Sequence, residues 1–100
     1  MSYPIRILTP EGPVFEHEAI EALQVTGYKG SMGILTGHAP MISALLTGPA
    51  KVTVDGKDQW FVFGEGTLEV RPPSVVLLID FAEKAASCED AKQIAAGDSA

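Results

Sequence analysis

Apolar and polar residues alternate along most of the first eighty positions, in short runs that glycine or proline interrupts. This period of two is typical of strands with one buried face, because successive side chains of a strand point to opposite sides of a sheet. The runs that we interpret as strands are Tyr3–Leu8, Val14–Phe15, Ala19–Val25, Met41–Leu46 and Thr67–Val70.

The clearest hairpin signal surrounds the dipeptide Asp55-Gly56. β-Branched and aromatic residues stand on both sides of it, over Lys51–Val54 and Gln59–Phe63. Asp-Gly between two such runs is the strongest short-range sign of a hairpin. We therefore predict two antiparallel strands joined at this turn.

Two runs are apolar on both faces. In a strand Phe61 and Phe63 share one side while Trp60 and Val62 share the other, and we expect both sides to be buried rather than to form an aromatic ligand platform. The run Val75–Ile79 shows no alternation at all, which predicts a strand that is covered on both faces.

Short strands at this spacing, with glycine or proline between them, predict an all-β fold. The expected architecture is an antiparallel β-sandwich or flattened barrel of about ten short strands. A chain of 100 residues, of which 46% are apolar, suits one domain with one hydrophobic core.

The composition changes after the last of these runs. Residues Ala82–Ala96 are rich in alanine, glutamate and lysine, which favour helices, and Ser87 with Asp90 resembles a capping box. We expect one short, loosely held C-terminal helix or frayed tail. The predicted organisation is a β-sandwich domain over 1–81 and a short helical tail over 82–100, without a complete helical hairpin.

The densest turn chemistry lies in the segment Gly30–Pro40. Three glycines, a proline and His38 surround the apolar pair Ile34-Leu35. The pattern predicts a short strand between two tight turns, with His38 on the second. If Gly33 uses a positive φ, a valine there would damage the fold. The segment lacks the Lys-Ser/Thr pair of a phosphate-binding loop, and a plain loop whose histidine bonds to local backbone is the simpler interpretation.

Charge and composition exclude several classes of protein. The net charge of −6, without a cluster of lysine or arginine, disfavours nucleic acid and direct docking on anionic lipid. The sequence shows no run long enough to span a membrane and no secretory signal at its start. The lone Cys88 is compatible with a reducing compartment and is best read as a packing residue.

Residues that could carry chemistry are few and scattered. His17, His38 and Cys88 do not have the spacing of a zinc site. Ser31 or Ser43 could be drawn with His38 and Asp80 as a catalytic triad, but no nucleophile-elbow pattern supports it. We therefore expect no catalytic residues, no metal and no cofactor.

Five segments occur in order, nearly without gaps, between residues 3 and 84. They are Thr9-Pro10-Glu11-Gly12-x-Val14-Phe15, Gln24-Val25-Thr26-Gly27, Gly30-x-x-Gly33-Ile34-Leu35-x-Gly37-His38-Ala39-Pro40, Gly66-Thr67-Leu68-Glu69-Val70, and Val75–Asp80 followed by Ala82-Glu83. Together they resemble the epsilon subunit of F-type ATP synthases, over four-fifths of the chain.

The resemblance implies both a fold and a place in a complex. The amino-terminal domain of that family is a β-sandwich of about ten strands. The resemblance implies that this chain is a non-catalytic rotor component of the central stalk. It would link the gamma subunit to the ring of c subunits and couple proton transport to ATP synthesis. The chain would then be peripheral to the membrane through the complex, on the cytoplasmic face of a bacterial inner membrane or its organelle equivalent.

The resemblance also implies partner-binding residues. Ser31 falls where relatives often have a glutamate near the c-ring, so a salt bridge from this position is in doubt, and Met32 would supply apolar contact instead. His38, Ser43 and Thr9 are the candidates for the gamma side.

Two further expectations concern the tail and the alternative function. Many relatives carry a helical hairpin that can block ATP hydrolysis, and with room for one short helix we expect neither an inhibitory arm nor an ATP-sensing site here. The alternative function is a stand-alone β-sandwich protein-binding module. Exposed apolar side chains gathered on one face would favour the rotor component, and a uniformly polar surface would favour the module.

Overall fold

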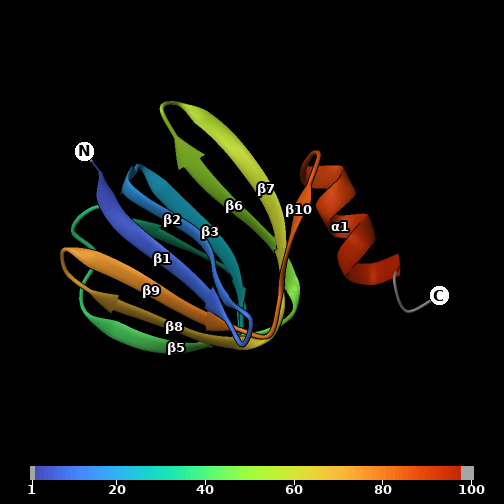
Figure 1. Ribbon diagram of the computed structural model, residues 1–100, viewed down its shortest axis with the longest axis horizontal. Coiled ribbons are helices and arrows are strands. Elements are labelled where there is room, and N and C mark those ends of the chain that lie inside the picture. Colours follow the sequence, from blue (N-terminus) through green and yellow to red (C-terminus); the bar gives the residue numbers. More distant parts are fainter. Residues whose placement is uncertain (1, 98–100) are drawn as a thin grey trace.

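The computed structural model describes residues 2–97 (Figure 1). Strands make up nearly all of the regular structure in this part of the chain, and a short helix follows them. The elements are β1 (Tyr3–Thr9), β2 (Gly12–Ile20), β3 (Ala22–Gly27), β4 (Gly30–Leu35), β5 (Met41–Leu45), β6 (Gly48–Val54), β7 (Lys57–Phe63), β8 (Gly66–Arg71), β9 (Ser74–Ile79), β10 (Ala82–Ala85) and α1 (Cys88–Gly97).

All ten strands join one sheet that curls around the core (Figure 1). The order of hydrogen-bonded neighbours is β10-β7-β6-β3-β5-β8-β9-β1-β2, and β4 pairs with β3 beside this path. The predicted all-β fold of about ten short strands is confirmed. The expectation of antiparallel pairing has one exception, since β1 and β9 run parallel, from Ile5 opposite Val75 to Leu8 opposite Leu78.

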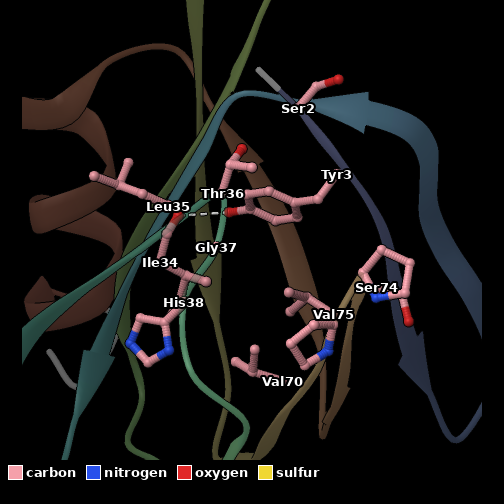
Figure 2. A pocket seen from close by; sticks show the side chains of 12 residues that line it. Ser2, Tyr3, Ile34, Leu35, Thr36, Gly37, His38, Val70, Ser74 and Val75 are labelled. Carbon is pink, nitrogen blue, oxygen red and sulfur yellow. Dashed lines mark hydrogen bonds between the residues drawn. The ribbon is translucent and has the colours of Figure 1, made fainter.

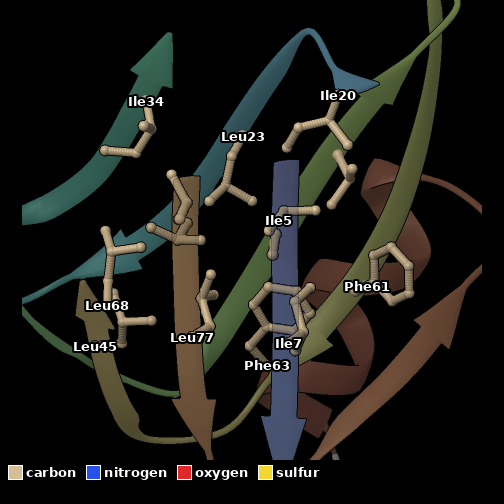
Figure 3. Packing of buried hydrophobic residues seen from close by; sticks show 14 of the residues in the cluster. Ile5, Ile7, Ile20, Leu23, Ile34, Leu45, Phe61, Phe63, Leu68 and Leu77 are labelled. Atoms are coloured by element: carbon tan, nitrogen blue, oxygen red, sulfur yellow. The ribbon is translucent and has the colours of Figure 1, made fainter. Parts of the chain in front are cut away.

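Alternation along the strands fills the core (Figure 3). Ile5 and Ile7 from β1 point inward beside Leu77 from β9, and all three are almost completely buried. Phe61 and Phe63 join this main cluster, whereas Val62 lies on the other side of β7 in a second small cluster with residues of β10 and α1. The expectation that both faces of this run are buried is confirmed.

The hairpin predicted at Asp55-Gly56 joins β6 to β7. Both turn residues have positive φ, 53° at Asp55 and 74° at Gly56. This is the combination that a two-residue type I′ turn requires. The turn is further held by Glu21, whose carboxylate accepts a 3.0 Å hydrogen bond from the backbone N–H of Gly56.

The expectation that Val75–Ile79 is covered on both faces is wrong. In β9 the burial alternates, so that Leu77 is fully buried while Leu78 is 54% exposed. Continuous burial belongs to sheets with helices on both faces. Here the single helix packs against β6, β7 and β10, and it leaves the outer face of β9 open.

The expected helix over 82–96 is wrong for its first four residues. Residues Ala82–Ala85 form β10, which pairs with β7 from Ala82 opposite Phe63 to Ala85 opposite Trp60. Backbone pairing with an available sheet edge outweighs the helical preference of this sequence, because tertiary context routinely overrides intrinsic propensity. The division of the chain at 81/82 stays a prediction, although the sheet continues to residue 85.

The capping box begins the helix as predicted. Ser87 Oγ accepts a 3.1 Å hydrogen bond from the backbone N–H of Asp90, and the Asp90 carboxylate accepts one of 2.8 Å from the N–H of Ala86. The helix then packs Ala91, which is fully buried, against Val62 of β7. The end of the predicted tail, residues 98–100, lies outside the described residues.

The two turns around β4 are confirmed, but Gly33 is not one of their strained positions. Gly30 has φ +115° and Gly37 has φ +86°, whereas Gly33 lies inside β4 opposite Gln24. A Cβ on Gly33 would meet nothing within 4 Å. The condition for damage by a valine at position 33 is therefore not met.

Candidate functional site

The β3–β4 hairpin determines which side chains of Gly30–Pro40 face outward. In the register, Ser31 lies opposite Thr26 and Leu35 opposite Ala22 on the outer side, while Ile34 lies opposite Leu23 on the inner side. Ile34 is 1% exposed and Leu35 63% exposed. The apolar pair that stood out in the sequence is thus split between core and surface.

Ser31 lies beside the helix rather than on an isolated loop. Its hydroxyl oxygen is 2.7 Å from Gln24 Nε2, which donates to it. Together they border a hollow of about 300 Å³ between the outer face of the sheet and α1. Two lysines line this hollow, Lys51 and Lys92, and Lys51 Nζ lies 4.0 Å from the carboxylate of Asp58.

His38 is held by the turn that follows β4. Its backbone N–H donates to Leu35 O at 3.1 Å, and its ring Nδ1 lies 2.8 Å from the carbonyl oxygen of Ala39. Because a carbonyl oxygen only accepts, Nδ1 is the donor in this contact. The simple interpretation of this histidine, that it bonds to local backbone, is therefore confirmed for one of its nitrogens.

A cavity of about 220 Å³ lies beside His38, between the end of β4 and the β8–β9 turn (Figure 2). Tyr3 forms one wall, and its hydroxyl donates a 2.6 Å hydrogen bond to Ile34 O. Val70 and Val75, which are opposite each other in the β8–β9 register, form another wall. The sequence marked one wall, within Gly30–Pro40, but not the cavity, because the other walls come from two distant parts of the chain.

Burial of Tyr3 makes a pH dependence of stability measurable. Desolvation of its ring raises the pKa of Tyr3 to about 12 from the ordinary value of 10.0. The folded state therefore holds the proton of Tyr3 more tightly than the unfolded state does. The contribution of this group to the free energy of unfolding is complete below pH 10 and is lost as the pH rises from 10 to 12. We expect the free energy of unfolding to fall there by up to about 1.4 kcal/mol per pH unit from this group.

Comparing the chain with Tyr3→Phe by urea unfolding at pH 9, 10 and 11 checks this expectation. The variant loses the ionisable hydroxyl together with its hydrogen bond to Ile34. It is therefore expected to be less stable at pH 9, and its free energy of unfolding should fall less steeply as the pH rises. Parallel declines in the two proteins would contradict it.

The expected partner-binding residues, assigned to the c-ring and to the gamma subunit, are spread over several strands and turns. Thr9 ends β1, where its hydroxyl donates to Gly12 O at 3.2 Å, while His38 lies beside Tyr3 at the other end of the same strand. Seven residues of strand separate these ends by roughly 20 Å. Met32 is half-buried against the core, and Ser43 of β5 donates to Ala44 O at 3.4 Å. The role of these five residues in binding partner subunits stays a prediction.

Exposed apolar side chains provide a signal that the sequence motifs missed. Seven large ones lie on the surface of the described chain, and four of them fall between residues 28 and 46. Tyr28 is 78%, Leu35 63% and Ile42 72% exposed. These four side chains flank the two ends of β4 and lie in or just after β5.

The histidine and the two serines drawn as a triad have other partners. His38 bonds to Ala39, Ser31 to Gln24, and Ser43 to its own strand. Within residues 2–97, no cluster of three or more histidine, cysteine, aspartate or glutamate side chains could hold a metal ion. What this surface offers is contact area and hydrogen bonds.

Comparison with known families decides the assignment. The family described as "ATP synthase, Delta/Epsilon chain, beta-sandwich domain" matches residues 2–85, which is the part of the chain that forms the sheet. The chain belongs to this family. The match ends at the last residue of β10, so the family's β-sandwich includes the strand that the sequence had suggested as helix.

Curated relatives extend the similarity towards the tail. The ATP synthase epsilon chain of Bacillus velezensis is 37% identical over 92 residues, which cover 92% of this chain and 69% of that protein. The epsilon chain of Bacillus thuringiensis is 37% identical over 84 residues, covering 84% of this chain and 62% of the other. The chain thus spans about two thirds of the length of these relatives.

Solved structures share the fold. A chain in the Euglena gracilis mitochondrial ATP synthase structure, titled OSCP/F1/c-ring, superposes with a TM-score of 0.78 at 21% identity, covering 83% of this chain and 53% of that one. A chain in the central stalk and c-ring structure of Tetrahymena thermophila mitochondrial ATP synthase gives 0.70 at 14% identity, covering 82% and 66%. At these identities the likeness supports the fold alone.

Proposed function

We propose that this chain is a non-catalytic rotor subunit of an F-type ATP synthase. It links the gamma subunit to the ring of c subunits in the central stalk and thereby couples proton transport to ATP synthesis. The observation that carries the proposal is the family match over residues 2–85. The epsilon-chain names of the Bacillus relatives and the c-ring titles of the structural neighbours support it.

The physical character of the domain suits a part that transmits torque. A single closely packed core joins all the main strands, and close packing gives a protein interior low compressibility. Exposed Tyr28, Leu35 and Ile42 offer apolar area for contact with neighbouring subunits. The epsilon-chain names of the relatives favour the rotor function over a stand-alone β-sandwich binding module.

The proposed location follows from the complex. The described part of the chain contains no helix that could cross a bilayer. In the proposal the subunit is therefore peripheral, on the cytoplasmic face of a bacterial inner membrane, and is held there by its partner subunits.

Binding to an isolated gamma subunit tests the proposal, with His38→Ala as the test variant and His17→Ala as its matched control. We expect the unmodified chain to bind and His38→Ala to bind several-fold more weakly, because the variant loses a half-buried ring next to the exposed Leu35. The other histidine, His17 of β2, is exposed and lies outside the segment Gly30–Pro40, so its removal should leave the affinity unchanged.

Calorimetric titration gives the affinities, and circular dichroism shows whether each variant is folded. An equal loss of affinity for gamma in the two histidine variants would contradict the assignment of His38 to the interface. No binding of the unmodified chain to gamma would contradict the rotor function itself and favour the stand-alone module.

A further inference from the structure

A hollow of about 320 Å³ lies where the two ends of the curled sheet meet, between β1 and β2 on one side and β7 and β10 on the other. Six of its eight lining residues are apolar, and the one charged residue among them is Lys84 of β10. We propose that this hollow binds a carboxylic acid with a medium-length apolar chain. The proposal does not depend on the rotor function, and none of the expected partner-binding residues lines the hollow.

Aromatic side chains form the floor of the hollow. Phe15 of β2 and Phe61 of β7 meet edge to face across it, with ring centroids 5.7 Å apart and ring planes at 71°. Phe63 lies beside Phe61 on the inner side of β7 (Figure 3). Phe61 is 7% exposed and so belongs to the core, whereas Val14, which also lines the hollow, is 46% exposed. An apolar chain in the hollow would cover Val14 and remove further apolar area from water.

Lys84 provides the place for the carboxylate. It lies opposite Phe61 in the β10–β7 register, so both side chains are on the same side of the sheet. Its Nζ lies 5.4 Å from the centroid of the Phe61 ring and donates a 3.1 Å hydrogen bond to Gln59 Oε1. The ion pairs formed within residues 2–97 do not involve Lys84. A positive charge therefore stands at an apolar hollow without a carboxylate of the chain beside it.

The acidic character of the chain does not cancel this attraction. The net charge of −6 repels an anion at long range, but exposed charges are largely screened beyond about 8 Å at physiological salt. No aspartate or glutamate lines the hollow. The ammonium group of Lys84 has three N–H donors and uses one on Gln59, so it can also donate to a bound carboxylate.

The edges beside the hollow are poorly suited to an added strand. β10 has only four residues, and β2 carries two register shifts and Pro13. Short edge strands, bulges and proline all hinder regular pairing with another strand. This favours a small molecule over an extended peptide. The volume lies near the lower limit of small-molecule sites, about 300–1,000 Å³, which favours one medium-length chain over a lipid with two long chains.

Octanoate and octanol are matched probes, because they share the apolar chain and differ in the charge of the head group. Titration of the whole chain, followed by amide chemical shifts, should show shifts confined to the hollow, around residues 14–15, 59–63 and 82–84. Octanoate should bind about five-fold more tightly than octanol, the ratio expected for one partly exposed ion pair. Hexanoate, which lacks two methylene groups, should bind about ten-fold more weakly than octanoate.

The variant Lys84→Met removes the charge and keeps an unbranched apolar side chain. It should weaken octanoate about five-fold and leave octanol within two-fold. Lys29→Met is the matched control, because Lys29 lies in the exposed β3–β4 turn outside the hollow and its loss changes the net charge equally. The control should leave the affinities for both probes within two-fold.

A third variant, Ala82→Leu, fills the hollow and should weaken both probes several-fold. Circular dichroism and gel filtration show whether each variant is folded and unaggregated. If Ala82→Leu does not fold, the two lysine variants retain a decisive test, because both replaced side chains are exposed.

Three results would overturn the proposal. The first is the absence of shifts with octanoate at concentrations up to the solubility limit of octanol. The second is shifts centred away from the hollow, which would indicate unspecific binding of an amphiphile. The third is an unchanged ratio of octanoate to octanol affinity in Lys84→Met, which would remove Lys84 from the site.

Discussion

Replacing Leu77 by alanine is expected to lower the free energy of unfolding by about 3 kcal/mol or more. Leu77 is 0% exposed and lies in the middle of β9, opposite Ile7 of β1 on one side and Leu68 of β8 on the other. Deleting its side chain leaves a cavity between three strands, and the hydrogen-bonded ladders prevent those strands from closing it. The loss therefore combines transfer energy with the cost of the cavity.

The next residue provides a matched control. Leu78 has the same side chain on the same strand, but it is 54% exposed on the outer face. Leu78→Ala should change the stability by less than about 1 kcal/mol. Urea unfolding of both variants checks the pair, and similar midpoints would contradict the burial pattern of β9.

Replacing Gly66 by alanine is expected to destabilise the domain by about 3 kcal/mol or more, or to prevent it from folding. Gly66 begins β8 and pairs with Leu45 on one side and Ile79 on the other. A Cβ at this position would collide with the carbonyl oxygen of Leu78 and lie 2.7 Å from the Cα of Ile79. These are backbone atoms of a neighbouring strand, so they cannot move aside as the end of a flexible side chain does.

Gly33→Ala is the control for this second prediction. Gly33 also lies in a strand, but a Cβ there would meet open space. We expect an unchanged or slightly higher melting temperature for Gly33→Ala, because alanine restricts the unfolded chain more than glycine does. A Gly66→Ala protein as stable as Gly33→Ala would contradict the close contact between β8 and β9.

Patterns of neighbouring residues were sufficient to predict turns, a hairpin and a helix cap, because these elements involve only a few consecutive residues. The Asp55-Gly56 hairpin, the Ser87–Asp90 cap and the turns at Gly30 and Gly37 were all predicted from neighbouring residues. Each depends on backbone conformation within a few positions, which residue type controls directly.

The wrong predictions concern long-range pairing and packing. Val75–Ile79 reads as buried on both faces, and only the position of α1 over other strands shows that one face is open. Ala82–Ala85 has helix-forming residues, and it becomes a strand because β7 offers a free edge. Gly33 looked like a turn residue, yet it lies in mid-strand opposite Gln24.

The candidate site was less predictable than the fold. The sequence directed attention to His38, but the cavity beside it needs Tyr3 and Val75 as well. Those residues come together only when the whole sheet has closed. Two of the residues that the resemblance implied, Thr9 and His38, lie near opposite ends of β1, because a motif records order along the chain and not position in space.

The parallel pairing of β1 with β9 has a consequence for how the protein is made. Ile5 pairs with Val75, seventy positions later. A ribosome releases the amino terminus first, so β1 emerges long before the strand that will flank it. β2 can join it early as a local hairpin, but the seam to β9 has to wait until most of the domain has been translated. The first strand of the chain is thus among the last to acquire all its neighbours, and during synthesis its apolar side chains lack the cover that β9 will supply.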